Sequence, residues 1–180
     1  MKNPLLVVSL VLLICFAFGC QNKAEKAELE KVKAQAEIEA QNIHVIEKLF
    51  AELGKRNAEI CYELYAPDSK YYFPSRISTP ISLDDEVAQA KMMFAALPDL
   101  TDEVVDIFAI KDRVIARIIF RGTHLAEMEG IPPTGNRVEI SALLIFRLKD
   151  GKVVEEVEEA DLLGFYQQLG MELKPKEVKK

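Results

Sequence analysis

The stretch RVIARIIFRGTH, residues 113–124, decides the fold, because its side chains alternate with the period of two that is typical of a β-strand. Ile118 and Phe120 fall on one face of this strand, and Arg117 and Arg121 fall on the other. Such a pattern predicts a strand with one face on an apolar core and the other face in contact with solvent or a partner.

Further strands are predicted on both sides of this one. The Lys-Asp pair at 111–112 predicts a hairpin to a strand over 103–110. After a loop rich in Gly and Pro, the Asp-Gly pair at 150–151 predicts a second hairpin, between strands over 137–148 and 153–160. The second half of the domain is therefore expected to be an antiparallel meander.

Helical patterns precede and follow these strands. Apolar residues at steps of three and four begin near Asn42 and end at Gly54, and Ser82 has the place of an N-cap for a helix that ends before Pro98. The other predicted segments are a helix over 58–65, an extended piece over 70–73 and a last helix over 162–169. This order predicts an α+β fold in which a curved sheet wraps a long helix.

The N-terminus has the pattern of an export signal. Lys2 precedes an apolar run over 5–18, which is shorter than the roughly 20 residues that a membrane-spanning helix needs. The small residues Ala17 and Gly19 then lead directly to Cys20, an arrangement that resembles a lipobox. The alternative is an ordinary secretory signal in which the cysteine is incidental.

We therefore expect residues 1–19 to be a signal peptide and Cys20 to carry lipid, palmitate included, as the mature N-terminus of a bacterial lipoprotein. The protein would be anchored to a membrane of the cell envelope, and Gln21 favours the outer membrane in a Gram-negative host. Residues 20–41, rich in Ala, Glu, Lys and Gln, are expected to form a solvated helical spacer or, alternatively, a coiled coil that binds a partner. Residues 171–180 form a charged tail.

Charge and cysteine content exclude several classes of protein. Once Cys15 has left with the signal and Cys20 is acylated, Cys61 is alone, so no intramolecular disulfide is expected. The formal net charge is −6, and no basic cluster is present, which argues against nucleic acid as a partner. The full sequence is 49% hydrophobic, and the mature chain is long enough to form one globular domain.

Several motifs in order give the chain a family likeness. The segments AALPDL, DRVIARIIFRGTH, GIPPTGNRVE, FRLKDGKVVEE and ADLLGFYQQLG, which lie between Ala95 and Gly170, resemble the SnoaL-like polyketide (ester) cyclases of the NTF2-like superfamily. The resemblance covers residues 42–170. It implies a cystatin-like cone in which a curved antiparallel sheet wraps N-terminal helices around an apolar pocket, and a homodimer formed through the outer face of the sheet.

The resemblance also implies a chemistry. Cyclases of this kind close a polyketide ester by an intramolecular aldol reaction without metal or cofactor, and a carboxylate at the end of the last strand, matched here by Asp161, serves as general acid/base. The partner would be a small apolar or polyketide-like molecule. Asp161 is also well placed to cap the helix that follows it. A non-catalytic ligand-binding lipoprotein and a structural envelope protein remain alternatives.

Other candidates for the site follow from strand parity. His124 and Phe120 share one face of their strand, so both side chains are expected to point at the pocket. His124 would be a second catalytic group and Phe120 a substrate contact. The alternative for His124 is a hydrogen-bonded core residue. Tyr72 stands where many relatives place a histidine and can donate a hydrogen bond to an oxyanion. Glu127 could reach the pocket mouth or be solvated.

Four glutamates crowd the last predicted strand, at positions 155, 156, 158 and 159. No His or Cys accompanies them at a spacing typical of metal ligands, so we expect a solvated strand edge and no metal site. Val157 stands where relatives commonly have tryptophan, a residue that this chain lacks altogether. Together with Tyr72, this departure from the family pattern leaves the substrate of this protein open.

Overall fold

The computed structural model describes residues 4–74, 79–172 and 174. Residues 4–22 and 24 are described only by their place in helix α1, so the side chain of Cys20, the predicted lipid attachment site, lies outside the described set. Most of the predicted C-terminal tail lies outside it as well. Within the described residues, no helix is long and apolar enough to cross a membrane.

The chain divides into two compact units, Met1–Ile38 and Glu39–Lys180. Helix α1, Pro4–Leu53, contributes to both. In the first unit, the side chains described from residue 23 onward are exposed, apart from the half-buried Gln35. The second unit carries the sheet and all the other helices of the described chain.

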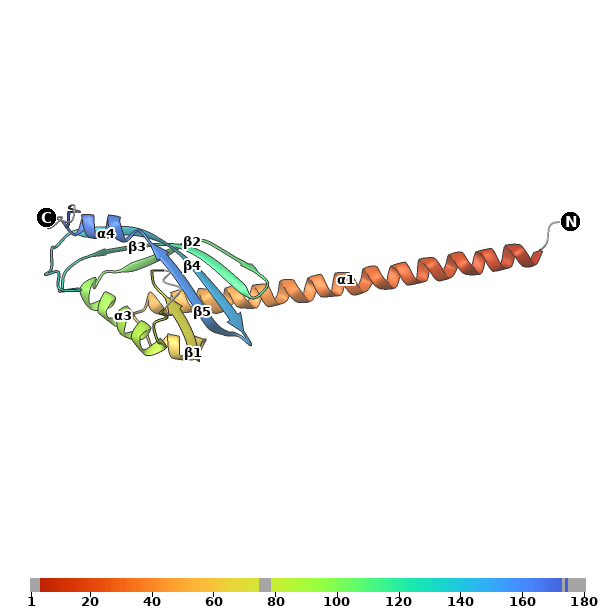
Figure 1. The fold of residues 1–180 in the computed structure, drawn as a ribbon, viewed down its shortest axis with the longest axis horizontal. Helices are drawn as coiled ribbons and strands as arrows, with labels where there is room; N and C mark the ends of the chain where they lie inside the picture. Colours follow the sequence, from red (N-terminus) through yellow and green to blue (C-terminus); the bar gives the residue numbers. More distant parts are fainter. Residues whose placement is uncertain (1–3, 75–78, 173, 175–180) are drawn as a thin grey trace, which may run out of the picture. The chain divides into compact units, whose positions relative to one another are not determined.

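The second unit has the predicted α+β fold (Figure 1). Its five strands lie in the order β1-β5-β4-β3-β2, and the sheet curves around the C-terminal part of α1. All neighbours are antiparallel except β1 and β5, which are parallel. The strands are β1 Tyr65–Tyr72, β2 Thr101–Ile110, β3 Arg113–Thr123, β4 Arg137–Lys149 and β5 Lys152–Ala160; the helices are α2 Ile60–Leu64, α3 Leu83–Ala96 and α4 Leu162–Gln168.

Most predicted bounds agree with the structure to within two residues, and the exceptions are α1, which begins at Pro4 and not near Asn42, and β1. The helix predicted over 58–65 ends at Leu64, and the strand begins at once and passes through Pro67 instead of starting at Lys70. Proline is tolerated here because β1 is an edge strand: on its open side no neighbouring strand requires a backbone N–H as a hydrogen-bond donor. Its register against β5 shifts between Tyr65 and Lys70.

The core lies between α1 and the concave face of the sheet. Ile46 and Leu49 of α1 are almost completely buried, and the Phe50 ring meets the Phe146 ring of β4 edge to face with centroids 6.2 Å apart. Inward-facing residues of β3, such as Ile118, complete this cluster. The helix thus packs against the concave face of the sheet.

A β-bulge in β5 decides which of its side chains face inward. Glu155 pairs with Arg147 and Val153 pairs with Leu148, so Val154 is an extra residue on β5. The bulge follows a two-residue turn in which Asp150 and Gly151 both have positive φ, 52° and 74°. Because the extra residue resets the alternation, residues 156 and 158 share the inner face with residue 153.

Candidate functional site

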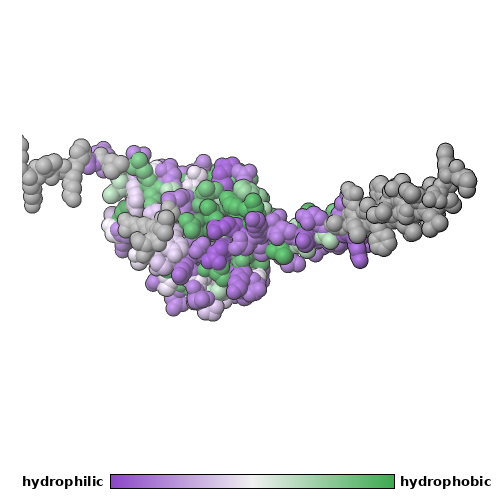
Figure 2. Space-filling view, turned by 45° about the vertical axis from the view of Figure 1, so that its right-hand side comes forward, coloured by the Kyte–Doolittle hydropathy of each residue, from purple (hydrophilic) through white to green (hydrophobic). Residues whose placement is uncertain are grey.

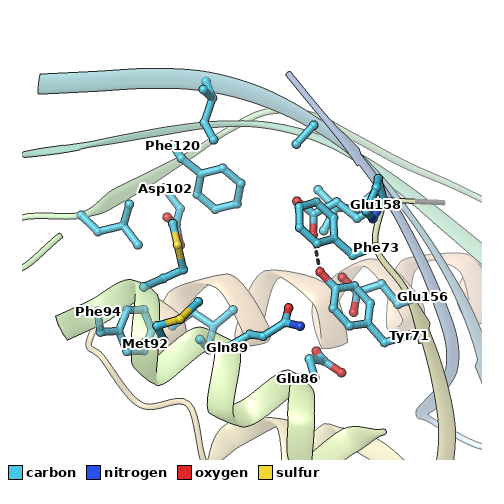
Figure 3. A pocket seen from close by; sticks show the side chains of 18 of the residues that line it. Tyr71, Phe73, Glu86, Gln89, Met92, Phe94, Asp102, Phe120, Glu156 and Glu158 are labelled. Carbon is cyan, nitrogen blue, oxygen red and sulfur yellow. Dashed lines mark hydrogen bonds between the residues drawn. The ribbon is translucent and has the colours of Figure 1, made fainter. Parts of the chain in front are cut away.

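A cavity of about 500 Å³ opens between the concave face of the sheet, α1 and α3. Its walls are mainly apolar and aromatic, with Met92 and Phe94 from α3, Phe120 from β3 and Phe165 from α4 (Figure 3). A concave, mostly apolar cavity with a few convergent polar groups is the usual form of a small-molecule site. The polar groups of this cavity would therefore determine which molecule binds and what can happen to it.

Besides the exposed Glu129, four carboxyl groups from three elements line this cavity: Glu86 of α3, Asp102 of β2, and Glu156 and Glu158 of β5. The prediction of a solvated glutamate edge is wrong for the last two, which are only 4% and 9% exposed. The bulge at Val154 is the reason, since it turns both side chains inward. The other two glutamates of the group do lie outside: Glu155 pairs with Arg147 at 3.4 Å, and Glu159 is exposed.

Two tyrosines of β1 hydrogen-bond to the glutamates of β5. The Tyr71 hydroxyl donates to Oε2 of Glu158 at 2.8 Å, the contact drawn as a dashed line in Figure 3. The Tyr65 hydroxyl donates to Oε2 of Glu156. Tyr71 also stacks on Phe73, with ring planes 2° from parallel. These contacts fix the rotamers of both carboxyl groups at the cavity wall.

Burial shifts the pKa of Glu158 and of Asp102 toward neutrality. The pKa of Glu158 rises to about 7, chiefly through burial, while the Tyr71 hydrogen bond opposes the rise and the charge of Asp102 adds to it. Burial raises the pKa of Asp102 to about 6, against the attraction of Arg56. A carboxyl group with a pKa in this range can both accept and give a proton near pH 7.

The carboxyl groups of Glu86 and Glu156 are neighbours. Burial raises the pKa of Glu86 to about 7, and burial followed by the charge of Glu86 holds the pKa of Glu156 well above its usual range. Two carboxyl groups that interact in this way cannot easily ionise together, because like charges repel strongly away from water. The pair therefore retains a proton at neutral pH.

The cavity lining described by the structure contains no Lys, Arg or His. The nearest cation is Arg56, whose guanidinium group lies over the Phe94 ring at 5.2 Å and donates to the carbonyl oxygens of Leu97 and Leu100 at 3.3 and 3.2 Å. Among the described residues, no group of three or more His, Cys, Asp or Glu side chains is arranged to hold a metal ion.

The substrate contacts expected from sequence fall in different places. Phe120 lines the cavity. Tyr72 is half-buried but absent from the lining, and its neighbour Tyr71 points inward instead. Glu127 is exposed, and its Oε1 accepts a hydrogen bond from the Gly130 amide at 2.8 Å. The structure thus brings one of the three into the cavity.

Asp161, the predicted acid/base, is the N-cap of α4. Its Oδ1 accepts a hydrogen bond from the Gly164 amide at 2.8 Å, as the capping alternative requires. The side chain is exposed and is not part of the cavity lining, although the residues on either side of it, Ala160 and Leu162, are. Asp161 therefore lies at the edge of the cavity.

His124, the second predicted catalytic residue, is completely buried just beyond the end of β3. Its Nδ1 lies 3.2 Å from Thr134 Oγ1 and accepts a hydrogen bond from the Thr134 amide at 3.3 Å. Its Nε2 has no partner among the described residues. The ring does not line the cavity, so strand parity, which places Phe120 correctly, does not extend to His124.

Sequence reasoning missed Asp102, which lies one residue before the strand predicted over 103–110, and it missed the three inward glutamates for two different reasons. Glu156 and Glu158 depend on a bulge that no turn residue announces. Glu86 could have been found, because it lies three and four residues before Gln89 and Ala90, which also line the cavity, and so shares their face of α3. In the sequence it reads instead as one of three acids in the first turn of a helix.

Comparisons with known proteins agree with this architecture. The family model described as SnoaL-like polyketide cyclase matches residues 44–169. A crystal structure from Jannaschia sp. CCS1, a candidate SnoaL-like polyketide cyclase, has a TM-score of 0.68 at 24% identity and covers 76% of this chain and 96% of its own; at this identity it shows the fold alone. IdmH, a candidate polyketide cyclase from Streptomyces antibioticus, has a TM-score of 0.64 at 31% identity and covers 73% and 99%.

Curated relatives match over a shorter stretch. The aklanonic acid methyl ester cyclase DnrD from Streptomyces peucetius is 35% identical over 57 residues, 32% of this chain and 39% of its own length. The cyclase AcmA from Streptomyces galilaeus is 35% identical over 68 residues, 38% and 47% of the two chains. These matches span less than half the length of either relative. The family model nevertheless covers most of the chain, and so the chain belongs to the SnoaL-like polyketide cyclase family.

Proposed function

We propose that this protein is a cofactor-independent cyclase or isomerase that binds a small, largely apolar molecule in the cavity and moves protons with its buried carboxyl groups. One observation carries the proposal: Asp102 and Glu158 face an apolar cavity, and their pKa values are about 6 and about 7. Between these values one group is mostly ionised and the other mostly protonated. That combination supplies a general base and a general acid in one site.

The proposed reaction is an intramolecular aldol closure. The Asp102 carboxylate takes a proton from the carbon between two carbonyl groups, and the electrons of the broken C–H bond form an enolate. The enolate attacks another carbonyl carbon of the same molecule, and the Glu158 carboxyl gives its proton to the alkoxide oxygen that results. Asp102 ends protonated and Glu158 ionised, so proton exchange with water restores the site.

Asp161 is the second candidate for the acid/base, because the family resemblance assigns the role to its position. Its side chain lies at the edge of the cavity and already caps α4. Ligand binding would have to bring the reacting carbon to this edge. Since Asp102 and Glu158 require no such shift, we propose them first.

Turnover of aklanonic acid methyl ester, the compound in the names of the curated relatives, tests the proposal. We expect Asp102→Asn and Glu158→Gln each to lower the rate of the full chain by about a hundredfold or more, the usual contribution of a general acid or base. The rate should be bell-shaped in pH, rising as Asp102 ionises and falling as Glu158 loses its proton. Chromatography of the cyclised product measures both effects.

Glu103→Gln is the matched control, because Glu103 follows Asp102 in β2 but is exposed and pairs with Arg121 at 2.6 Å. Its rate should equal that of the wild type. Loss of activity in Asp161→Asn alone would contradict the assignment to Asp102 and Glu158. A wild-type protein that binds the ester but never converts it would instead support a non-catalytic binding protein.

We also propose that Cys20 carries lipid and anchors the protein in the bacterial cell envelope. The support is the apolar run that ends in small residues directly before Cys20. Cells grown with labelled palmitate should incorporate it into the wild-type chain and not into Cys20→Ser, while Cys61→Ser retains the label. Equal labelling of the wild type and Cys20→Ser would refute the anchor.

A further inference from the structure

The polar end of the cavity contains an acceptor that nothing satisfies. Glu86, Glu156 and Tyr71 lie next to one another on one side of the view in Figure 3, and Asp102 lies on the other side beside Phe120. Oε2 of Glu86 is buried and has no hydrogen-bond partner in the described part of the chain. Its Oε1 lies 3.9 Å from the weak donor Sγ of Cys61, and the Tyr65 hydroxyl and the Glu156 carboxyl group also interact with the Glu86 carboxyl group.

We propose that the molecule bound in this cavity carries a basic amine, and that Glu86 binds its ammonium group at the polar end formed with Glu156 and Glu158. The proposal rests on the proposed function in that it takes the same cavity as the ligand site. It adds the chemical class of the ligand, an apolar body with a protonated amine, and a residue that determines specificity.

The balance of charge in the cavity supports this ligand class. Apart from the exposed Glu129, four carboxyl groups line the cavity, and within the described lining no basic side chain faces them. Arg56, whose charge acts on Asp102, is already engaged by backbone carbonyls and the Phe94 ring. Buried carboxylates without a cation are costly, and clusters of this kind are typical of functional sites.

A neutral or anionic ligand fits these groups less well. A hydroxyl can donate to Glu86 Oε2 but brings no charge to offset the neighbouring carboxylates. A carboxylate adds a further negative charge to a site where like charges already repel. An ammonium group donates hydrogen bonds and neutralises charge at once, while Met92, Phe94 and Phe73 can contact its apolar body.

The groups around Glu86 determine how binding depends on pH. The groups that contribute to the electrostatics of this cluster are Glu156 and Glu158 of β5, Tyr65 and Tyr71 of β1, and Cys61 of α2. Burial raises the pKa values of the two tyrosine hydroxyls and of the Cys61 thiol. These three remain neutral between pH 5.5 and 8. Glu86 and Glu158 ionise there, each with a pKa of about 7, so the site becomes more negative as pH rises.

Three matched probes test the proposal by titration calorimetry of the full chain: 1-naphthylmethylamine, 1-naphthalenemethanol and 1-naphthoate. We expect the amine to bind at least about tenfold more tightly than the alcohol at pH 8, and the acid to bind most weakly. Between pH 5.5 and pH 8 the affinity for the amine should rise about tenfold, because the carboxyl groups that bind it become ionised and a shift of one pKa unit on binding corresponds to a tenfold change in affinity. The alcohol affinity should change little, because the alcohol has no charge.

The variant Glu86→Gln tests whether Glu86 is the residue that gives the cavity its preference for the amine. It keeps the size of the side chain and removes the charge, so the amine should lose most of its advantage over the alcohol while the alcohol binds as before. Asp85→Asn, an exposed neighbour in the same helix turn, is the matched control and should retain the advantage.

The outcomes separate this inference from the proposed function. An alcohol that binds as tightly as the amine overturns the inference and leaves the apolar-ligand site standing. A preference for the amine that survives in Glu86→Gln overturns the role of Glu86. If none of the three probes binds, the cavity is not a site for small apolar molecules, and the proposed function fails with the inference.

Discussion

At the residue scale, the buried carboxyl groups of the cavity oppose folding at neutral pH. Glu86 and Glu158 have pKa values of about 7 in the folded chain, whereas the reference value is 4.5. Between these values the folded state binds more protons than the unfolded chain, so the free energy of unfolding falls as pH rises. Below pH 4.5 both states are protonated and the penalty disappears.

We therefore predict that the protein is more stable to urea at pH 5 than at pH 8. The expected difference in the free energy of unfolding is about 3 kcal/mol, less than the sum of the pKa shifts of Glu86 and Glu158 at 1.36 kcal/mol per pKa unit. Carboxyl groups with lowered pKa values, such as Asp99, are ionised in both the folded and the unfolded state from pH 5 to pH 8 and so do not change this difference. Glu86→Gln should reduce the difference between the two pH values. Stability that rises from pH 5 to pH 8 would contradict the assignment of these groups.

The same residues show why the site is hard to find in a sequence. Glu156 and Glu158 belong to an acidic run that composition places in solvent, and their burial depends on partners 85 or more positions away, Tyr65 and Tyr71. Phe120 follows from strand alternation alone. Asp161 was predicted both as an acid/base and as a helix cap, and the structure shows the cap.

At the element scale, the end of α3 meets β3 so closely that only glycine fits between them. A Cβ atom at Gly122 would lie 2.8 Å from Leu97 Cδ2 and 3.3 Å from the Leu100 Cα atom. The turn after α3 is held there by Arg56, which donates to the carbonyl oxygens of Leu97 and Leu100. This contact fixes β2, and with it Asp102, against the cavity.

We predict that Gly122→Ala destabilises the protein by about 1–3 kcal/mol, the usual cost of overpacking at a site that cannot relax freely. The measurement is the free energy of unfolding in urea. Gly54→Ala is the control, because its Cβ would come no closer than 3.4 Å to any atom, and its effect should stay within about 0.5 kcal/mol. Equal effects of the two substitutions would show that the contact at Gly122 is not tight.

Helices and strands can be predicted from the sequence where the local signals agree, and the prediction fails where those signals conflict or are absent. Ser82 caps α3 as expected, with its side chain accepting from the Asp85 amide at 3.2 Å, and the Asp-Gly turn leads into β5. The start of β1 is missed because Pro67 reads as a strand breaker. The bulge at Val154 is missed because Val is an ordinary strand residue, and only the register against β4 reveals the extra position.

At the scale of the whole molecule, the outer face of the sheet offers a surface for a second copy, and we propose a homodimer through it. Phe108 and Leu143 are 55% and 45% exposed, and Ile115 pairs with Ile145 across the middle of this face. Arg117 is matched by Asp106 at 2.8 Å, so charges there are already compensated. Figure 2 shows hydrophobic patches bordered by hydrophilic residues on one face of the second unit.

We predict that the protein is a dimer by light scattering and that Leu143→Glu makes it monomeric, since a new charge buried in a dimer interface is strongly unfavourable. Leu125→Glu is the control: Leu125 is also 55% exposed but lies beyond the end of β3, so the dimer should persist. A wild-type monomer, or a dimer unaffected by Leu143→Glu, would contradict an interface on this face.

The sequence by itself determined the family, the α+β architecture, the order of the elements and the apolar side of β3, because these follow from local periodicity, capping and turn residues. The tertiary structure alone decided the chemistry of the cavity. Burial and pKa depend on what surrounds a side chain, and Glu86, Asp102, Glu156 and Glu158 come together only when α3, β2 and a bulged β5 close around one space. The stretch over 113–124 thus predicts one strand of the cavity wall, while the cluster of buried carboxyl groups in the cavity forms only on folding.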